Sequence, residues 1–160
     1  MKKNIEIRNQ LFNTISGLTD EQLNKHPEFG RWSIIQVMDH LYLMERAITK
    51  GIADTLTADV RKKAADKPIH LAVDRSMKVE APAYLEPSSE FITIESMTEK
   101  LIQSREWLSE VTKHAKEEDL ENKSFPHPIF SNLSLKQWIP FVGIHELRHI
   151  EQIEELKAKL

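Results

Sequence analysis

The sequence predicts an all-α protein, with residues 1–160 folded as a single four-helix bundle. Glycine and proline are sparse, 4 and 7 among 160 residues, and few stretches alternate apolar and polar residues as strands do. Four long segments instead repeat apolar residues at the three-and-four spacing of amphipathic helices. Four such helices joined through one long crossover, between the second and the third, pack most simply as a bundle.

The first expected helix covers residues 3–16. It ends before Gly17, because glycine readily adopts the left-handed conformation found after a helix C-terminus. Residues 19–22, Thr-Asp-Glu-Gln, have the spacing of a capping box and predict a short helical turn. That turn stops before Pro27, since the residue before a proline avoids the helical conformation.

The second long helix has the clearest pattern and runs from Ser33 to about Ile52. Ser33 is the expected N-cap, Gln36 completes a capping box three residues later, and Trp32 precedes them. The side that we expect to be buried is an apolar stripe of Ile34, Val37, Met38, Leu41, Met44 and Ile48.

Residues 53–92 lack a sustained helical pattern, and three prolines interrupt them. A connection this long is unusual within a compact domain unless it crosses the bundle or covers a site. We therefore expect this crossover to shape a pocket.

The third helix is expected at residues 93–116, after which residues 117–132 are polar and contain two prolines. The last helix begins at Ser134, with Gln137 again three residues later, and continues to the C-terminus. Pro140 lies within its first two turns, where it should kink the helix or split off a short leading turn.

Composition argues against several classes of protein. No apolar run approaches the roughly 20 residues of a membrane span, and no apolar segment follows the charged N-terminus as in a secretory signal. The absence of cysteine removes disulfides, thiolate ligands and a cysteine nucleophile. The formal charge is −3 with acids and bases interleaved, so neither nucleic acid nor membrane is an expected partner. These features fit a cytoplasmic location.

Three histidines predict a metal site. His145 and His149 are four residues apart on the last helix, so both side chains lie on one face and can reach one ion at roughly 2.0–2.1 Å. The pair alone could be two surface histidines, but His40 on the second helix faces the same interior. Three neutral imidazoles that leave a position open are typical of a catalytic metal site. We therefore expect one divalent ion on His40, His145 and His149.

The same segment reads His145-Glu146-Leu147-Arg148-His149, the H-E-x-x-H motif of zinc metalloproteases, whose glutamate is a general base. That motif is expected with a downstream third ligand and a framing sheet. Here 11 residues follow His149 and no sheet is predicted, so the protease interpretation is disfavoured. Glu146 is kept as a candidate acid–base group, although it points about 100° around the helix from His145.

Four further polar residues are candidates around this site. Gln152 shares the stripe of the last helix's histidines and could hydrogen-bond a ligand, a bound water or a substrate. Asp39 is a second candidate acid–base group and, like Glu45, could hold a ligating imidazole, unless both are simply solvated carboxylates. His127 precedes the last helix and either approaches the site or serves the loop.

The Trp32-Ser33 opening, the Asp39-His40-Leu41 segment, the approach at residues 127–138 and the final His145–His149 helix resemble the DinB-like superfamily. The likeness is strongest to its YfiT-like metal-dependent hydrolases and covers nearly the whole chain. Ser131 departs from the pattern, because relatives often have glycine at this place in the loop.

The resemblance implies an up-down-down-up bundle, commonly a homodimer, with nickel or zinc on a triad that maps to His40, His145 and His149. Characterised relatives include S-transferases that use a low-molecular-weight thiol, bacillithiol or mycothiol. Because this chain has no cysteine, a thiol nucleophile would have to arrive as a small co-substrate. We therefore expect a hydrolase or a thiol S-transferase acting on a small molecule. The alternative is a non-enzymatic bundle that binds a metal or another ligand.

Overall fold

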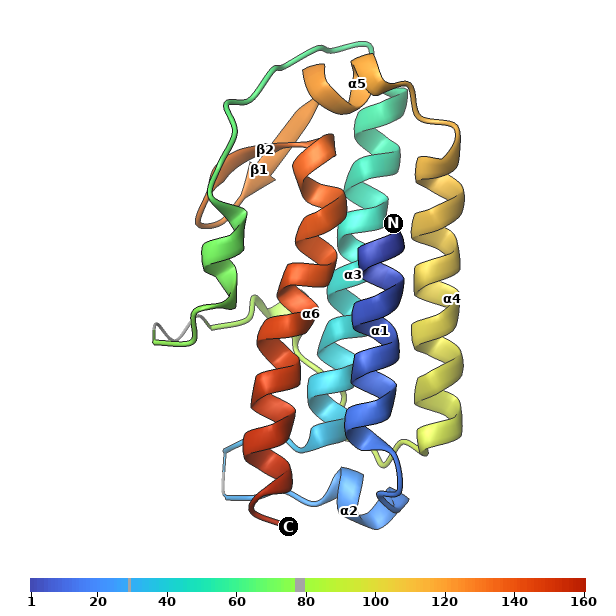
Figure 1. The fold of residues 1–160 in the computed structure, drawn as a ribbon, viewed down its shortest axis with the longest axis vertical. Coiled ribbons are helices and arrows are strands. Elements are labelled where there is room, and N and C mark those ends of the chain that lie inside the picture. The colour runs from blue at the N-terminus through green and yellow to red at the C-terminus, as the bar shows by residue number, and fades with distance from the viewer. Residues whose placement is uncertain (29, 77–79) are drawn as a thin grey trace.

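The computed structural model describes residues 1–28, 30–76 and 80–160. Its long helices are α1 (Lys2–Ile15), α3 (Ile34–Thr57), α4 (Ile94–Lys113) and α6 (Leu135–Lys157). They lie side by side along the long axis of the molecule (Figure 1). The predicted four-helix bundle is therefore confirmed.

The helix directions follow the expected up-down-down-up order. In Figure 1, α1 and α6 run down the view, whereas α3 and α4 run up it. The 24 residues of α3 extend for about 36 Å. Because α3 and α4 point the same way, the chain must travel that length back between them, and this is why the crossover is long. It contains two short 3₁₀ helices, η1 (Ile69–Val73) and η2 (Ala83–Leu85).

The predicted helix starts are built as the sequence indicated. The Ser33 hydroxyl accepts a hydrogen bond from the backbone N–H of Gln36, and the Gln36 side chain accepts one from the N–H of Ser33. The same reciprocal box opens α2 (Asp20–Asn24) at Thr19. Each box satisfies two backbone donors that a helix N-terminus otherwise leaves unpaired.

Two residues near the start of the last helix can be compared with their predictions. Pro140 lies inside α6, which is unbroken from Leu135 to Lys157, so of its two predicted effects the splitting off of a leading turn does not occur. Ser134 caps the helix through the N–H of Gln137, but the Gln137 side chain does not turn back to complete a box. It bonds instead to both backbone groups of Lys67, which fastens the crossover to α6.

Residues 117–132, expected as a polar connection, contain structure that the sequence analysis missed. Helix α5 (Glu117–Asn122) precedes an antiparallel hairpin of β1 (Ser124–His127) and β2 (Ser131–Ser134). Phe125 faces Leu133 across the hairpin and stacks on Trp138 of α6 at 4.4 Å between ring centroids. Ser131 has a φ of 61°, in the left-handed region that glycine adopts more readily than other residues.

The apolar core consists of two clusters. The first joins α1, α2, α3, α4 and α6 and includes Leu11, Leu23, Ile35, Met38, Leu101 and Ile153. The second lies around the hairpin and includes Ile52, Leu108, Leu133, Leu135, Trp138 and Phe141. Across the described residues, no helix combines the length and apolar character that crossing a membrane requires.

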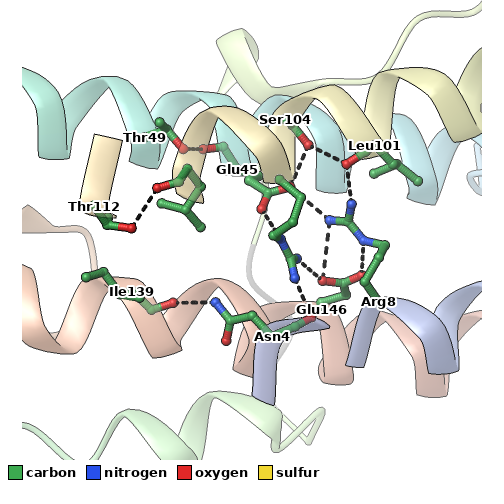
Figure 2. Close-up of polar contacts among 11 residues, drawn as sticks. Asn4, Arg8, Glu45, Thr49, Leu101, Ser104, Thr112, Ile139 and Glu146 are labelled. Atoms are coloured by element: carbon green, nitrogen blue, oxygen red, sulfur yellow. Dashed lines mark hydrogen bonds and ion pairs between the residues drawn. The ribbon is translucent and has the colours of Figure 1, made fainter. Parts of the chain in front are cut away.

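The bundle also buries charge. Arg8, Glu45, Arg105 and Glu146, one from each long helix, form what we call the four-charge cluster. Arg8 contacts Glu45 at 2.8 Å and Glu146 at 2.5 Å, while Arg105 contacts Glu45 at 2.5 Å and Glu146 at 2.7 Å. Figure 2 shows Arg8, Glu45 and Glu146 pointing toward one another between the helices. Two positive and two negative charges balance, which is the condition under which buried charges are tolerated.

Candidate metal centre

The structure brings the three predicted histidines together. His40 comes from α3, and His145 and His149 come from successive turns of α6. One ring nitrogen from each histidine can be chosen so that all three lie within 4.8 Å of one another. The centroid of the His40 ring lies 5.3 Å from that of His145 and 5.0 Å from that of His149. Side chains from two helices therefore converge on one point inside the bundle.

Two of the imidazoles are held through Nδ1. His40 Nδ1 lies 2.9 Å from the Leu85 carbonyl oxygen, an atom that only accepts, so this nitrogen carries the proton. His149 Nδ1 lies 2.8 Å from Gln152 Oε1, which also accepts from Arg75 Nη1 at 3.4 Å. Because a guanidinium only donates, the Gln152 atom is the amide oxygen and His149 is protonated on Nδ1. Both residues therefore keep Nε2 free to bind a metal.

One pair of nitrogens in the cluster has the spacing of ligands to a single small divalent ion. In a tetrahedral site with metal–nitrogen bonds of about 2.05 Å, neighbouring nitrogens lie about 3.3 Å apart. In the structure, Nε2 of His145 lies 3.2 Å from Nε2 of His149. Three imidazole nitrogens without thiolate or further protein ligands are a set that zinc and nickel accept.

Burial keeps the three imidazoles neutral. Desolvation lowers the pKa of His149 to about 3, with a smaller contribution from the nearby His40. Desolvation also lowers the pKa of His145 well below its usual value, and the neighbouring histidines lower it further. The pKa of His40 is lowered by burial, against the opposing effects of the Leu85 carbonyl and Asp39. Neutral imidazoles have the lone pair that a metal requires, without competition from protons near pH 7.

The crossover supplies the outer contacts of this centre. Besides Leu85 and Arg75, the backbone N–H of Ser88 donates to Asp39 Oδ2 at 2.9 Å. Its carbonyl accepts from Gln36 at 3.1 Å. Residues 53–92 were expected to shape the site, and contacts from this crossover orient two of the three imidazoles.

Both candidate acid–base carboxylates are engaged away from the histidine nitrogens. Glu146, whose side chain is 2% exposed, accepts from both arginines of the four-charge cluster. Asp39 binds Ser88 and lies 3.5 Å from Lys100 Nζ, so it ties the crossover and α4 to α3. Glu45 belongs to the four-charge cluster as well. Through these contacts, the three carboxylates stabilise the fold around the site.

His127 lies near the centre but is separated from it by an aromatic ring. Its Nδ1 accepts from the backbone N–H groups of Ile129 and Phe130 at 3.0 and 3.2 Å, which closes the hairpin turn. The centroid of its ring lies 4.7 Å from that of Phe141, and the centroid of the Phe141 ring lies 6.0 Å from that of His145. Burial lowers the pKa of His127 to about 4. The structure thus shows the loop role that was one of its two predicted interpretations.

Two contributors to the centre were not among the predicted site residues. Leu85 acts through a backbone carbonyl, which leaves no signal in the side-chain pattern. Arg75 lies in the crossover, 77 residues from Gln152, and no spacing rule connects the two. Trp32, noted as a residue before the helix cap, also packs its ring 5.1 Å from that of His40.

Comparison with known proteins places this chain in a family. The family profile described as the DinB superfamily matches residues 5–153. This chain belongs to the DinB superfamily. The uncharacterized protein YuaE of Bacillus subtilis (strain 168) is 39% identical to it over 155 residues, which cover 97% of this chain and 95% of YuaE.

Two solved structures share the fold of this DinB-superfamily chain. TT2238, described as "a four-helix bundle protein", superposes with a TM-score of 0.66 at 19% identity, covering 96% of this chain and 94% of its own. YfiT from Bacillus subtilis superposes with a TM-score of 0.65 at 17% identity, covering 98% of this chain and 83% of its own. YfiT is described as "a probable metal-dependent hydrolase with an unusual four-helix bundle topology". At these identities the two structures support the fold.

Proposed function

We propose that this protein is a metal-dependent hydrolase of small molecules, with one zinc or nickel ion bound by Nε2 of His40, His145 and His149. The observation that carries the proposal is the convergence of three neutral imidazoles, two of which have their Nδ1 protons held by fixed acceptors. Membership of the DinB superfamily and the description of YfiT support the same class of activity.

In this proposal, the residues of this chain bind the metal ion and orient the histidine rings that hold it. A divalent ion at such a site supplies a Lewis acid and lowers the pKa of a bound water toward neutrality. Leu85 and Gln152 hold Nδ1 of His40 and His149, which leaves Nε2 of each ring for the metal ion. Since Glu146 and Asp39 are held in other contacts, we assign neither of them to proton transfer.

Metal content is the first test. We would measure metals in natively purified, untagged protein, in His40→Ala, and in a matched control, His114→Ala, which changes an exposed histidine. The proposal expects about one zinc or nickel per chain in the wild type and the control and a large loss in His40→Ala. No stoichiometric metal in the wild type, even after reconstitution, would refute the proposed centre.

Turnover is the second test. The metal-loaded protein is offered simple esters and amides, and separately an electrophile with a low-molecular-weight thiol. Hydrolysis that His145→Ala abolishes with helicity retained supports the proposal. Thiol transfer in place of hydrolysis would assign the S-transferase class instead. Bound metal without turnover would assign a binding protein.

The homodimer expected from the family resemblance is a separate proposal. Light scattering coupled to size-exclusion chromatography gives the mass in solution directly. A mass near twice the 18.6 kDa of the chain supports a dimer, and a mass near that of one chain refutes it.

A further inference from the structure

One of the three proposed ligands, His145, differs from the other two in the contacts of its second ring nitrogen. His40 and His149 each donate from Nδ1 to a fixed oxygen. His145 is contacted at Nε2, 3.2 Å from Nε2 of His149, and among the described residues none forms a hydrogen bond with its Nδ1. A ligating imidazole normally donates its second N–H to a carboxylate, a carbonyl or a water.

A small cavity adjoins this histidine. It offers about 10 Å³ to the centre of a water molecule, and its polar wall is formed by His145 with Arg8, Glu45 and Glu146. Aliphatic side chains of α3 and α6, among them Val142, close the remaining wall. That volume corresponds to one water, and a polar wall is what distinguishes a hydrated cavity from a dry one.

The four-charge cluster can accept hydrogen bonds from such a water. Glu45 Oε1 accepts one hydrogen bond, from Arg105 Nε, and Glu146 Oε1 accepts one, from Arg8 Nε. A carboxylate oxygen has two lone pairs, so both oxygens keep an acceptor position. We propose that one water molecule occupies this cavity and links His145 Nδ1 to the carboxylates of the four-charge cluster. The inference rests on the metal centre proposed above and makes Glu45 and Glu146 positioning residues for His145.

A water molecule is a better hydrogen-bond partner for His145 Nδ1 than a fixed carbonyl or carboxylate oxygen would be. Because His149 has its proton on Nδ1, the contact between the two Nε2 atoms requires His145 to carry its proton on Nε2 in the metal-free protein. Its Nδ1 is then an acceptor. With Nε2 bound to a metal, the proton resides on Nδ1, which becomes a donor. A water can serve both states, whereas a carbonyl or carboxylate oxygen can serve only the second.

Zinc affinity of cavity variants tests the proposal. We would titrate Zn²⁺ against a chromophoric chelator in the wild type, Val142→Ile and Val142→Ala, with circular dichroism melts to show that each is folded. Val142→Ile fills the cavity, expels the water and is expected to weaken zinc binding about tenfold or more. Val142→Ala enlarges the cavity, keeps the water and is expected to bind zinc like the wild type.

The outcomes separate this inference from the proposed function. Equal zinc affinity in Val142→Ile and wild type overturns the water link alone, as does an equal loss in both variants. Failure of the wild type to bind zinc overturns the metal centre and the link together. A high-resolution crystal structure of zinc-loaded wild type provides a test that needs no variant. It should show a water within hydrogen-bonding distance of His145 Nδ1 and of a carboxylate oxygen of Glu45 or Glu146, and its absence overturns the link.

Discussion

Replacing Glu146 with glutamine should unfold the protein more readily, because it leaves the two buried arginines with one carboxylate. Glu146 contacts Arg8 at 2.5 Å and Arg105 at 2.7 Å. Taking charge centres about 4 Å apart and an effective dielectric constant near 20, each pair contributes about 4 kcal/mol, or about 8 kcal/mol together. Desolvation of the carboxylate offsets several kcal/mol of this, so Glu146→Gln should lower the free energy of unfolding by about 3–5 kcal/mol.

Urea denaturation of the metal-free protein measures this change in the free energy of unfolding. In thermal unfolding, the melting temperature should fall by about 10–15 °C for a chain of this length. Glu151→Gln is the matched control, since it makes the same substitution at an exposed position of the same helix. Its effect should stay within about 0.5 kcal/mol. A Glu146→Gln variant as stable as the wild type would refute the structural role.

Three further predictions follow from separate contacts. Gln152→Leu removes the acceptor that orients His149 and should weaken zinc binding by about 10- to 100-fold in a chelator competition. His127 has a folded-state pKa of about 4, below its unfolded value of about 6.5. The unfolded state therefore binds more protons between these values, so this contribution to stability is complete above about pH 6.5 and is lost as the pH falls toward 4. His127→Asn should flatten that dependence in urea unfolding measured from pH 7 to 4, and an unchanged slope would contradict the assignment. Gly143→Ala places a methyl group 2.6 Å from Asn4 Oδ1. It should lower the free energy of unfolding by about 1–3 kcal/mol in thermal unfolding, despite alanine's better helix propensity. A more stable variant would show that α1 can move aside.

The parts of this structure that the sequence predicted depend on local patterns. Ser33 and Gln36 mark a helix start through contacts three residues apart, and the apolar stripe behind them predicts which face is buried. The same periodicity places His40 on the interior side of α3. Two periodic helices were therefore enough to predict the histidine cluster.

The parts that the sequence did not predict depend on distant partners. Glu146 looks like an acid–base candidate until Arg8, 138 residues away, is seen to bind it. The hairpin was missed because Pro126 is a poor strand residue, and because Phe125 gains its stability by stacking on Trp138. The carbonyl of Leu85 has no side-chain signature. Such contacts arise only once the bundle has assembled.

The four-charge cluster also constrains how the chain can acquire this structure during synthesis. It takes one residue from each long helix, and Glu146 on α6 is the last of them to emerge from a ribosome. Until α6 is available, Arg8 and Arg105 share one carboxylate, and α1 lacks the helix against which it packs. A three-helix intermediate would therefore bury unbalanced charge, which is costly. We expect folding to be concerted, with a rate limited by bringing Glu146 on α6 to Arg8 on α1, 138 residues away.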